Sequence, residues 1–310
     1  MKKTILITGG AGFIGSNLCK FFIKKDFEVI TIDNLSTGFK ENIPNGVQFI
    51  EGNCQDPEVI FSLKNKKIDA IFHISGQSSG EISFDNPIYD LESNTSSTIL
   101  LLELAVLTNC NKFYYASTMS TYGYHGNNVV SEDFNQVPVS FYGVGKLASE
   151  NYLRLYQQRG INSVALRLFT VYGPGQNLSN LRQGMVSIFL AQAYFNKKIQ
   201  IKGSLERYRD FVYIDDVINA FVKSYEKNLT GYNFFNVSTN KKTTVKELIH
   251  KIQSLFEDKI EYFIEGSTEG DIQGIFGDNN KIKKLLNWEP KFQLDDGLKL
   301  MFEWIKNERA

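Results

Sequence analysis

The chain has 310 residues, of which 42% are hydrophobic and 22% charged, and 34 basic and 34 acidic side chains give a formal net charge of +0. This length is sufficient for one large domain, or two joined ones, with a substantial core. The balanced charge and the lack of a basic tract argue against nucleic acid or an anionic membrane as a partner. A small-molecule substrate is therefore expected.

Three cysteines, Cys19, Cys54 and Cys110, show no metal-ligand spacing and cannot all pair with one another. They are interpreted as reduced, buried thiols, which are typical of a reducing compartment. The first apolar run, Thr4–Thr8, is short and glycines follow it at once, so neither a signal peptide nor a membrane span is predicted. A cytoplasmic protein is expected.

In chain order, the first 170 residues alternate short apolar runs with segments of three-to-four-residue apolar spacing. The predicted strands are Thr4–Thr8, Glu28–Ile32, Val47–Ile50, Ala70–His73, Phe113–Ala116 and Ser163–Leu168. The predicted helices between them include Phe13–Lys25, Ile88–Thr108 and Phe141–Arg159. This alternation is typical of a parallel sheet covered on both faces, so the fold class expected is α/β, a Rossmann-type doubly wound sheet.

After Pro174 the pattern loosens and predicts a smaller, mixed α/β half. Helices are expected near 182–195, 215–226, 244–256 and 295–307, and strands near 199–201, 209–213 and 260–264. The predicted domains are therefore a dinucleotide-binding domain, 1–174, and a substrate domain, 175–310, some segments of which pack back on the first. No long linker separates them, so a shared cleft is expected.

The segment Thr8–Gly15 follows the first predicted strand and opens the first predicted helix, which is the context of a dinucleotide-binding turn. Glycine permits the tight turn and lets backbone amides approach a pyrophosphate at the helix N-terminus. The expected cofactor contacts in this turn are Gly9, Gly12, Phe13, Ile14 and Gly15.

Asp33 ends the second strand 18 residues beyond Gly15, near the offset of a carboxylate that binds the adenosine ribose. A carboxylate there repels a 2′-phosphate, so NAD is favoured over NADP. The alternative is that Asp33 only caps the turn Asp33-Asn34-Leu35.

Tyr142 and Lys146 are four residues apart and hence on one face of the predicted helix. A free tyrosine has a pKa of about 10, and a nearby cation favours its phenolate, which can serve as a general base. Thr118 ends the preceding strand, where its hydroxyl can bond the substrate oxygen. Taken alone, the same spacing is more often an exposed helix face.

Six stretches together resemble the NAD-dependent epimerase/dehydratase family of extended short-chain dehydrogenases/reductases, and are similar to its UDP-hexose and UDP-uronate 4-epimerases. They are Thr8–Gly15, Asp33–Leu35, Ser117–Gly123, Tyr142 with Lys146, Leu166–Pro174 and Tyr208–Val212. The resemblance implies NAD in the first domain, a nucleotide sugar, with a UDP-sugar favoured, mainly in the second, and a homodimer through Ile88–Thr108 and Phe141–Arg159.

The resemblance also implies roles for individual residues. Thr118, Tyr142 and Lys146 are the expected catalytic group, and Tyr142 and Lys146 also contact the cofactor. Asn34, Asn53 and Asn94 are further expected cofactor contacts, and the substrate contacts expected are Ser79, Thr118, Thr170, Arg209 and Asp271. Two of these have plain alternatives, since Asn94 can satisfy backbone groups and Asp271 can cap a turn.

The sequence departs from the family at four places. Met119-Ser120 replaces the Asp-Glu of 4,6-dehydratases, so elimination of water lacks its proton carriers. Thr170 stands where many hexose epimerases have asparagine, and Asn53 where an aspartate often meets adenine. The arginine often found before the Gly-Asp motif is absent and Ser267-Thr268-Glu269 stand there, so that phosphate contact is either lost or supplied by Arg207 or Arg182.

The function expected is C4 epimerisation of a nucleotide sugar through a transient 4-keto intermediate. The alternatives are a nucleotide-sugar reductase or dehydrogenase with net redox change, a 4,6-dehydratase, and a non-catalytic NAD-binding sensor. His73 ends a strand near the cofactor region, where a metal or acid–base role competes with that of a packed histidine. The other histidines have no ligand-spaced partners, so no catalytic metal is expected.

Overall fold

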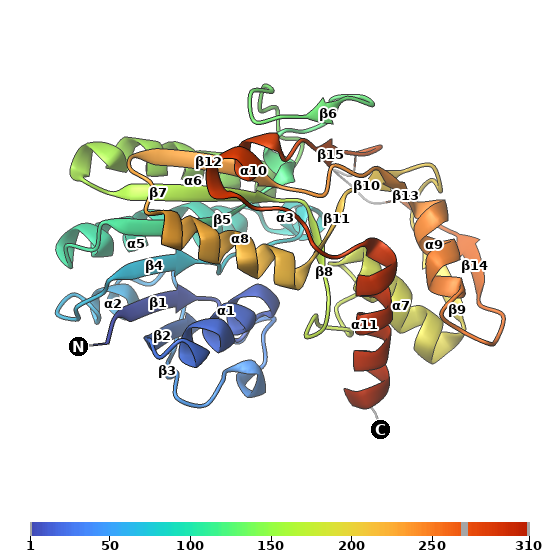
Figure 1. Cartoon of the computed structure of the whole chain (residues 1–310), viewed down its shortest axis with the longest axis horizontal. Coiled ribbons are helices and arrows are strands. Elements are labelled where there is room, and N and C mark those ends of the chain that lie inside the picture. The colour runs from blue at the N-terminus through green and yellow to red at the C-terminus, as the bar shows by residue number, and fades with distance from the viewer. Residues whose placement is uncertain (1, 268–271, 309–310) are drawn as a thin grey trace.

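The computed structural model describes residues 2–267 and 272–308, and it is built on one seven-stranded parallel sheet (Figure 1). The sheet order is β12-β7-β5-β4-β1-β2-β3. The strands are β1 Thr4–Thr8, β2 Glu28–Asp33, β3 Gln48–Glu51, β4 Ala70–His73, β5 Lys112–Thr118, β7 Asn162–Leu168 and β12 Tyr232–Val237. Every neighbouring pair is parallel, which confirms the predicted Rossmann-type α/β class.

Alternating strand side chains supply two separate cores, one on each face of the sheet. On β4, Phe72 joins the core that contains Phe22 of α1 and Phe221 of α8. The preceding residue, Ile71, joins the opposite core with Leu102 of α5. Figure 1 shows α1 and α8 in front of the sheet and α5 and α6 behind it. Both faces are buried, as the apolar strand runs require.

The helices in chain order are α1 Phe13–Lys24, α2 Pro57–Phe61, α3 Gly80–Asp85, α4 Pro87–Leu91, α5 Ser97–Leu107, α6 Phe141–Tyr156, α7 Met185–Asn196, α8 Ile214–Lys227, α9 Val245–Gln253, α10 Asn280–Leu286 and α11 Leu294–Glu308. Short 3-10 turns occur at Lys40–Asn42, Met119–Thr121 and Gln157–Arg159. Among the described residues, no helix is both long and apolar enough to cross a membrane.

The helix predicted over 88–108 is present, but a π-helical turn, Glu92–Ser96, interrupts its α-helical hydrogen-bond pattern between α4 and α5. The polar residues of this turn compete for backbone carbonyls. Ser97 Oγ donates to Ser93 O over 2.6 Å, and Thr98 Oγ1 donates to Asn94 O over 2.6 Å. The turn buries Asn94 toward α6, so the interruption affects the region of the expected catalytic residues.

The second half of the chain contributes to both parts of the molecule. Its β12 pairs with β7 as the edge strand of the large sheet, and α8 covers the front face. This strand was not predicted, because its asparagines interrupt the apolar pattern and its Asn236 is buried through hydrogen bonds to Tyr122 and Glu132. The boundary at 174/175 stays a prediction.

The remaining elements form a smaller lobe with α7, α9 and α11 (Figure 1) or short pairs beside the large sheet. Their strands are β6 Val129–Val130, β8 Thr170–Tyr172, β9 Lys198–Ile201, β10 Tyr208–Arg209, β11 Phe211–Tyr213, β13 Thr243–Thr244, β14 Glu261–Ile264 and β15 Phe276–Gly277. The single strand expected near 209–213 is two strands, since Asp210 between them is buried and accepts from Thr239 N and Oγ1.

Candidate active site

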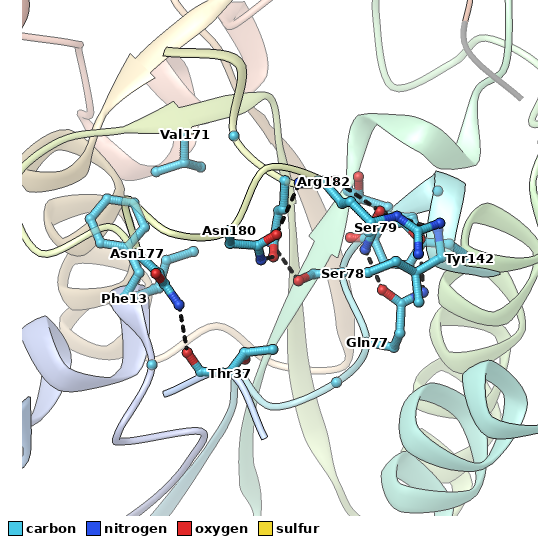
Figure 2. Close-up of a pocket in the computed structure, with 18 of the residues that line it drawn as sticks. Phe13, Thr37, Gln77, Ser78, Ser79, Tyr142, Val171, Asn177, Asn180 and Arg182 are labelled. Carbon is cyan, nitrogen blue, oxygen red and sulfur yellow. Dashed lines mark hydrogen bonds between the residues drawn. The ribbon is translucent and has the colours of Figure 1, made fainter. Parts of the chain in front are cut away.

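A cavity of about 930 Å³ opens at the carboxyl ends of the parallel strands, where the large sheet meets the smaller lobe. Its walls come from the glycine turn, the loops after β2, β4 and β5, the start of α6, and the segments 170–184 and 200–209. This is the usual position of a ligand in a doubly wound sheet. Figure 2 shows part of it, with Phe13 on one side and Tyr142 on the other.

The glycine turn forms a tight backbone cradle at the start of α1. Gly9 has φ +75°, and its N–H donates to Ile32 O over 2.8 Å. A Cβ on Gly15 would lie 2.0 Å from Gly9 O, so only glycine fits there. The turn and the first residues of α1 line the cavity with free space above the helix N-terminus, an arrangement that fits a dinucleotide pyrophosphate.

Asp33 caps the turn after β2, which is its alternative role, and it also lines the cavity. Its carboxylate is 8% exposed and lines the cavity, while Oδ2 accepts from Ala11 N over 2.9 Å and Oδ1 from Leu35 N over 2.8 Å. Asn34 also lines the cavity, and its Nδ2 donates to Asn53 Oδ1 over 2.7 Å. Asn53 is exposed and is not among the residues that line the cavity, so it is connected to the cavity only by this hydrogen bond to Asn34.

Thr118, Tyr142 and Lys146 lie together on the cavity wall. Ser140 caps α6 by accepting from Gly143 N over 3.1 Å, which aligns Tyr142 and Lys146 one turn apart. A Cβ on Gly143 would lie 2.6 Å from Ser120 O, so this glycine lets α6 approach the end of β5. The helical spacing predicted from sequence thus brings the expected catalytic group to one place.

Lys146 is 3% exposed and held from below by the sheet. Its Nζ donates to Ala116 O over 3.1 Å and lies 4.8 Å from the Tyr115 ring centroid and 5.9 Å from that of Tyr142. Burial lowers the pKa of Lys146 to about 8, and the charge of Asp90 opposes that shift. The ammonium therefore titrates close to neutral pH.

The expectation that Lys146 brings the tyrosine toward neutral pH is wrong for these residues alone. Burial raises the pKa of Tyr142 to about 12, against a lowering effect from the Thr118 hydroxyl, and Asp90 raises it further. Desolvation of the phenolate dominates because Tyr142 is only 8% exposed. Stabilising the phenolate therefore requires a further positive charge.

His73 is a packed residue in this structure. It is fully buried, its Nδ1 lies 2.9 Å from Thr8 Oγ1, and its Nε2 lies 3.1 Å from Thr98 Oγ1. Burial holds the pKa of His73 well below its usual range, and the charge of Lys146 adds to this. Within residues 2–267 and 272–308, no cluster of three or more His, Cys, Asp or Glu side chains is arranged to hold a metal ion.

Asn94 lies one layer behind the cavity wall. Its Nδ2 donates to Gln77 O over 3.0 Å and to Asp90 Oδ1 over 3.2 Å, whereas its buried Oδ1 has no hydrogen-bond partner in the described chain. A Cβ on Gly76 would lie 2.4 Å from that Oδ1 and 3.4 Å from Lys146 Nζ. Asn94 therefore donates to a backbone carbonyl, which is the alternative role expected from the sequence. Its side chain also lies near Lys146.

The other end of the cavity is basic. Arg209, 6% exposed on β10, donates to Tyr208 O over 2.7 Å and to Ile272 O over 3.2 Å. Arg207 and Arg182 line the same cavity, and Arg182 forms ion pairs with Glu81 and Asp85. Cations at this end suit a phosphorylated ligand.

Two more of the expected substrate contacts, Ser79 and Thr170, line the cavity. Ser79 Oγ donates to Arg182 O over 3.1 Å (Figure 2) and also accepts from Ile82 N at the start of α3. The Oγ1 of Thr170 is buried and has no hydrogen-bond partner in the part of the chain that the structure describes. Asp271 lies outside the described residues.

Two loops shape the cavity beyond the expected contact residues. The sequence predicts covers near Tyr124–Asn135 and Ser179–Gly184, whereas the loop after β2 carries no motif that predicts it. The loop after β2 packs on the glycine turn, where Phe39 N and Asn42 Nδ2 both donate to Ala11 O. The segment 176–183 crosses the opening, and Asn177 Nδ2 reaches Thr37 O over 3.4 Å (Figure 2). The run of serine and glycine in 75–80, directly after β4, was the available signal for a third loop.

A glycine turn before α1, an acid at the end of β2, and a Thr/Tyr/Lys group after β5 define a short-chain dehydrogenase/reductase. The sequence model of the NAD dependent epimerase/dehydratase family matches residues 5–238, and the chain belongs to that family. Its cofactor is NAD, and it is an enzyme of the epimerase type.

Three comparisons with known proteins are informative. The chain is 31% identical over 310 residues to a UDP-glucose 4-epimerase of Mycolicibacterium smegmatis, covering 98% of each chain. It resembles the crystal structure of a Thermotoga maritima UDP-glucose 4-epimerase with UDP-glucose, with a TM-score of 0.92, 33% identity, and coverage of 99% and 100%. It is also 31% identical to UDP-glucuronic acid decarboxylase 3 of Arabidopsis thaliana, over 96% of this chain and 88% of that one.

Proposed function

We propose that the protein is a UDP-sugar 4-epimerase acting on a hexose or uronate through a transient 4-keto intermediate. The observation that carries this proposal is the gathering of Thr118, Tyr142 and Lys146 on the wall of one cavity, between the glycine turn and the basic end. Met119 and Ser120 follow Thr118, so the proton carriers of a 4,6-dehydratase are missing.

Tyr142 is the proposed general base, which takes the proton of the sugar 4-hydroxyl at its phenol oxygen. Thr118 Oγ1 holds that sugar oxygen, and Lys146 supplies a positive charge beside the phenol. NAD+, when bound, would supply the acceptor for the C4 hydride, the source from which the same hydride returns to the opposite face of the turned 4-keto sugar, and a positive ring that favours the phenolate. Tyr142 then returns its proton to the oxygen on the inverted carbon.

The proposed cofactor residues are those of the glycine turn, Asp33 and Asn34 on the wall, the exposed Asn53 that bonds Asn34, and Asn94 behind the wall. The backbone amides of the turn hold the pyrophosphate, and the carboxylate of Asp33 binds ribose hydroxyls while its hydrogen bond to Ala11 N keeps the turn closed. The turn can close this tightly because a Cβ on Gly9 would lie 2.9 Å from Ser75 N and a Cβ on Gly15 would lie 2.0 Å from Gly9 O.

The proposed substrate residues lie on the rest of the wall. Arg209 grips the substrate pyrophosphate, with Arg207 and Arg182 near it in the same cavity. The unpartnered Oγ1 of Thr170 and the hydroxyl of Ser79 are hydrogen-bonding groups for the sugar. Asp271 remains a proposed contact to the nucleotide.

We further propose a homodimer through the outer faces of α4 and α6. Large apolar side chains are exposed there, including Ile88 at 63%, Leu91 at 48%, Phe141 at 46%, Val144 at 52% and Leu155 at 48%. The two helices pack against each other, so these side chains belong to one side of the molecule. A mass of twice 35.3 kDa in light scattering is expected, and a monomeric mass at micromolar concentration would sink this proposal.

The experiment that tests the function is a panel of UDP-, GDP-, CDP- and dTDP-sugars, incubated with purified protein without added NAD. Inversion at C4 by NMR, without lasting absorbance of reduced nicotinamide, is the expected result. Turnover that depends on added NAD(H) and changes its absorbance in step with product would make the protein a net oxidoreductase.

The similarity to a decarboxylase favours a second candidate, conversion of UDP-glucuronic acid with loss of CO2. A 4-keto uronate is a β-keto acid, so it can lose its carboxylate as CO2 when the keto oxygen accepts the electron pair. The panel distinguishes this outcome, because a pentose product then replaces the inverted uronate.

A further inference from the structure

A buried carboxylate beside the proposed catalytic group has no part in the mechanism described so far. Asp90 on α4 is 1% exposed. Its Oδ1 accepts from two neutral amides, Gln77 Nε2 over 2.7 Å and Asn94 Nδ2 over 3.2 Å. Burying a carboxylate is unfavourable unless hydrogen bonds and a nearby cation compensate for lost hydration.

The cation whose charge acts on the Asp90 carboxylate is Lys146. Helices α4 and α6 approach closely at Gly145, where a Cβ would lie 3.4 Å from Asp90 Oδ2. Lys146 follows directly, and its Nζ flanks Gly76 together with the Oδ1 of Asn94. Asp90 thus lies against the turn of α6 that carries Lys146, and its Oδ1 accepts from the Asn94 amide whose oxygen flanks Gly76 together with Nζ.

The other titratable groups near Lys146 are neutral or already paired. His73 on β4 has its pKa lowered by burial, and burial raises the pKa of the Tyr115 phenol on β5, so both are uncharged at neutral pH. Glu150, one turn further along α6, is ion-paired with Arg167. Of the charges in the described residues, Asp90 is therefore the one that acts on Lys146.

We propose that Asp90 is a positioning residue of the active site, whose buried charge keeps Lys146 protonated and whose oxygen fixes the amides of Gln77 and Asn94. Gln77 in turn donates to Ser79 O over 2.8 Å and to Asp90, so the same carboxylate steadies the loop that carries a proposed substrate contact. The inference rests on the proposed function of Lys146, but not on which sugar is turned over.

The test uses Asp90→Asn, because an asparagine oxygen can still accept from both amides while the charge is removed. Without that charge the pKa of Lys146 falls from about 8, by about one pH unit or more. The shift is measured by NMR on the protein with 13Cε-labelled lysine, with the resonance assigned by its loss in Lys146→Met. This readout requires no turnover.

Glu92→Gln is the matched control, since it removes an exposed carboxylate two residues away on the same helical segment and should leave the Lys146 midpoint unchanged. In assays, the alkaline limb of the kcat–pH profile should move down in Asp90→Asn by the same amount. An unchanged Lys146 midpoint in Asp90→Asn overturns the proposal. A shifted midpoint without turnover of any nucleotide sugar contradicts the proposed function alone.

Discussion

The two halves of α6 hold buried charges in different ways. Near its middle, Glu150 accepts from Arg167 Nε and Nη2 and from Ser117 Oγ and Tyr232 OH, so every oxygen of the carboxylate is bonded. Near its start, Lys146 donates to one carbonyl, and its counter-charge Asp90 bonds neutral amides. The Glu150 carboxylate therefore has all its hydrogen-bond partners within the protein, whereas the Lys146 ammonium, with a single hydrogen bond to Ala116 O, lies on the cavity wall.

The largest effect is expected at Tyr142, which lies one turn before Lys146 on the cavity wall. Tyr142→Phe removes the proposed base and should lower kcat by about 10²–10⁴-fold while NAD remains bound. Steady-state kinetics and the cofactor content of the purified variant measure both. Unchanged turnover would mean that another residue is the general base.

The next largest effect is expected on stability, at the buried ion pair of Glu150 and Arg167. Glu150→Gln leaves the guanidinium of Arg167, which is 2% exposed, without its counter-charge, so the free energy of unfolding should fall by about 3–5 kcal/mol. Urea unfolding measures it, with the exposed Glu226→Gln as the control, expected to stay within about 0.5 kcal/mol. A loss of less than about 1 kcal/mol would remove the distinction between the two groups.

A smaller effect is expected at the basic end of the cavity. Arg209→Lys keeps the charge but loses the planar fork, so KM for the nucleotide sugar should rise about tenfold with little change in kcat. Arg154→Lys on the exposed side of α6 is the control and should change neither constant. An unaltered KM in Arg209→Lys would place the substrate pyrophosphate elsewhere.

The smallest effect is a pH dependence of the wild-type protein. The pKa of Lys146 is lowered to about 8, so kcat should decline as pH rises through that value and the ammonium is lost. Lys146→Arg keeps its charge, and its profile should lack that decline. If both profiles fall together, the alkaline limb belongs to another group.

The two ends of the cavity also differ in how far sequence alone defined them. The cofactor end rests on contiguous motifs, since Thr8–Gly15 forms both the turn and the helix start, and the strand that ends in Asp33 follows directly. The fold class and most large-sheet strands follow from local apolar patterns in the same way. The edge strand β12 did not, because a buried Asn236 is satisfied only by distant partners.

The substrate end is assembled from segments far apart in the chain, and so tertiary packing decides it. Ser79 and Arg182 are 103 residues apart and meet only through the fold. Asp90 carries no motif in the sequence, and its burial beside Gly145 comes from the packing of α4 against α6, two helices that are far apart in the chain. The sequence predicted the group of Thr118, Tyr142 and Lys146, but not the buried carboxylate of Asp90 near Lys146.

In the proposed mechanism, one C4 hydrogen leaves and returns within the same active site. The most direct measurement is to incubate the protein, without added NAD, with the active nucleotide sugar deuterated at C4 and to examine the product by NMR. The expected product has an inverted C4 that retains its deuterium, with no accumulation of reduced nicotinamide. An inverted product that has lost the deuterium, or reduced nicotinamide that accumulates with product, would contradict this mechanism.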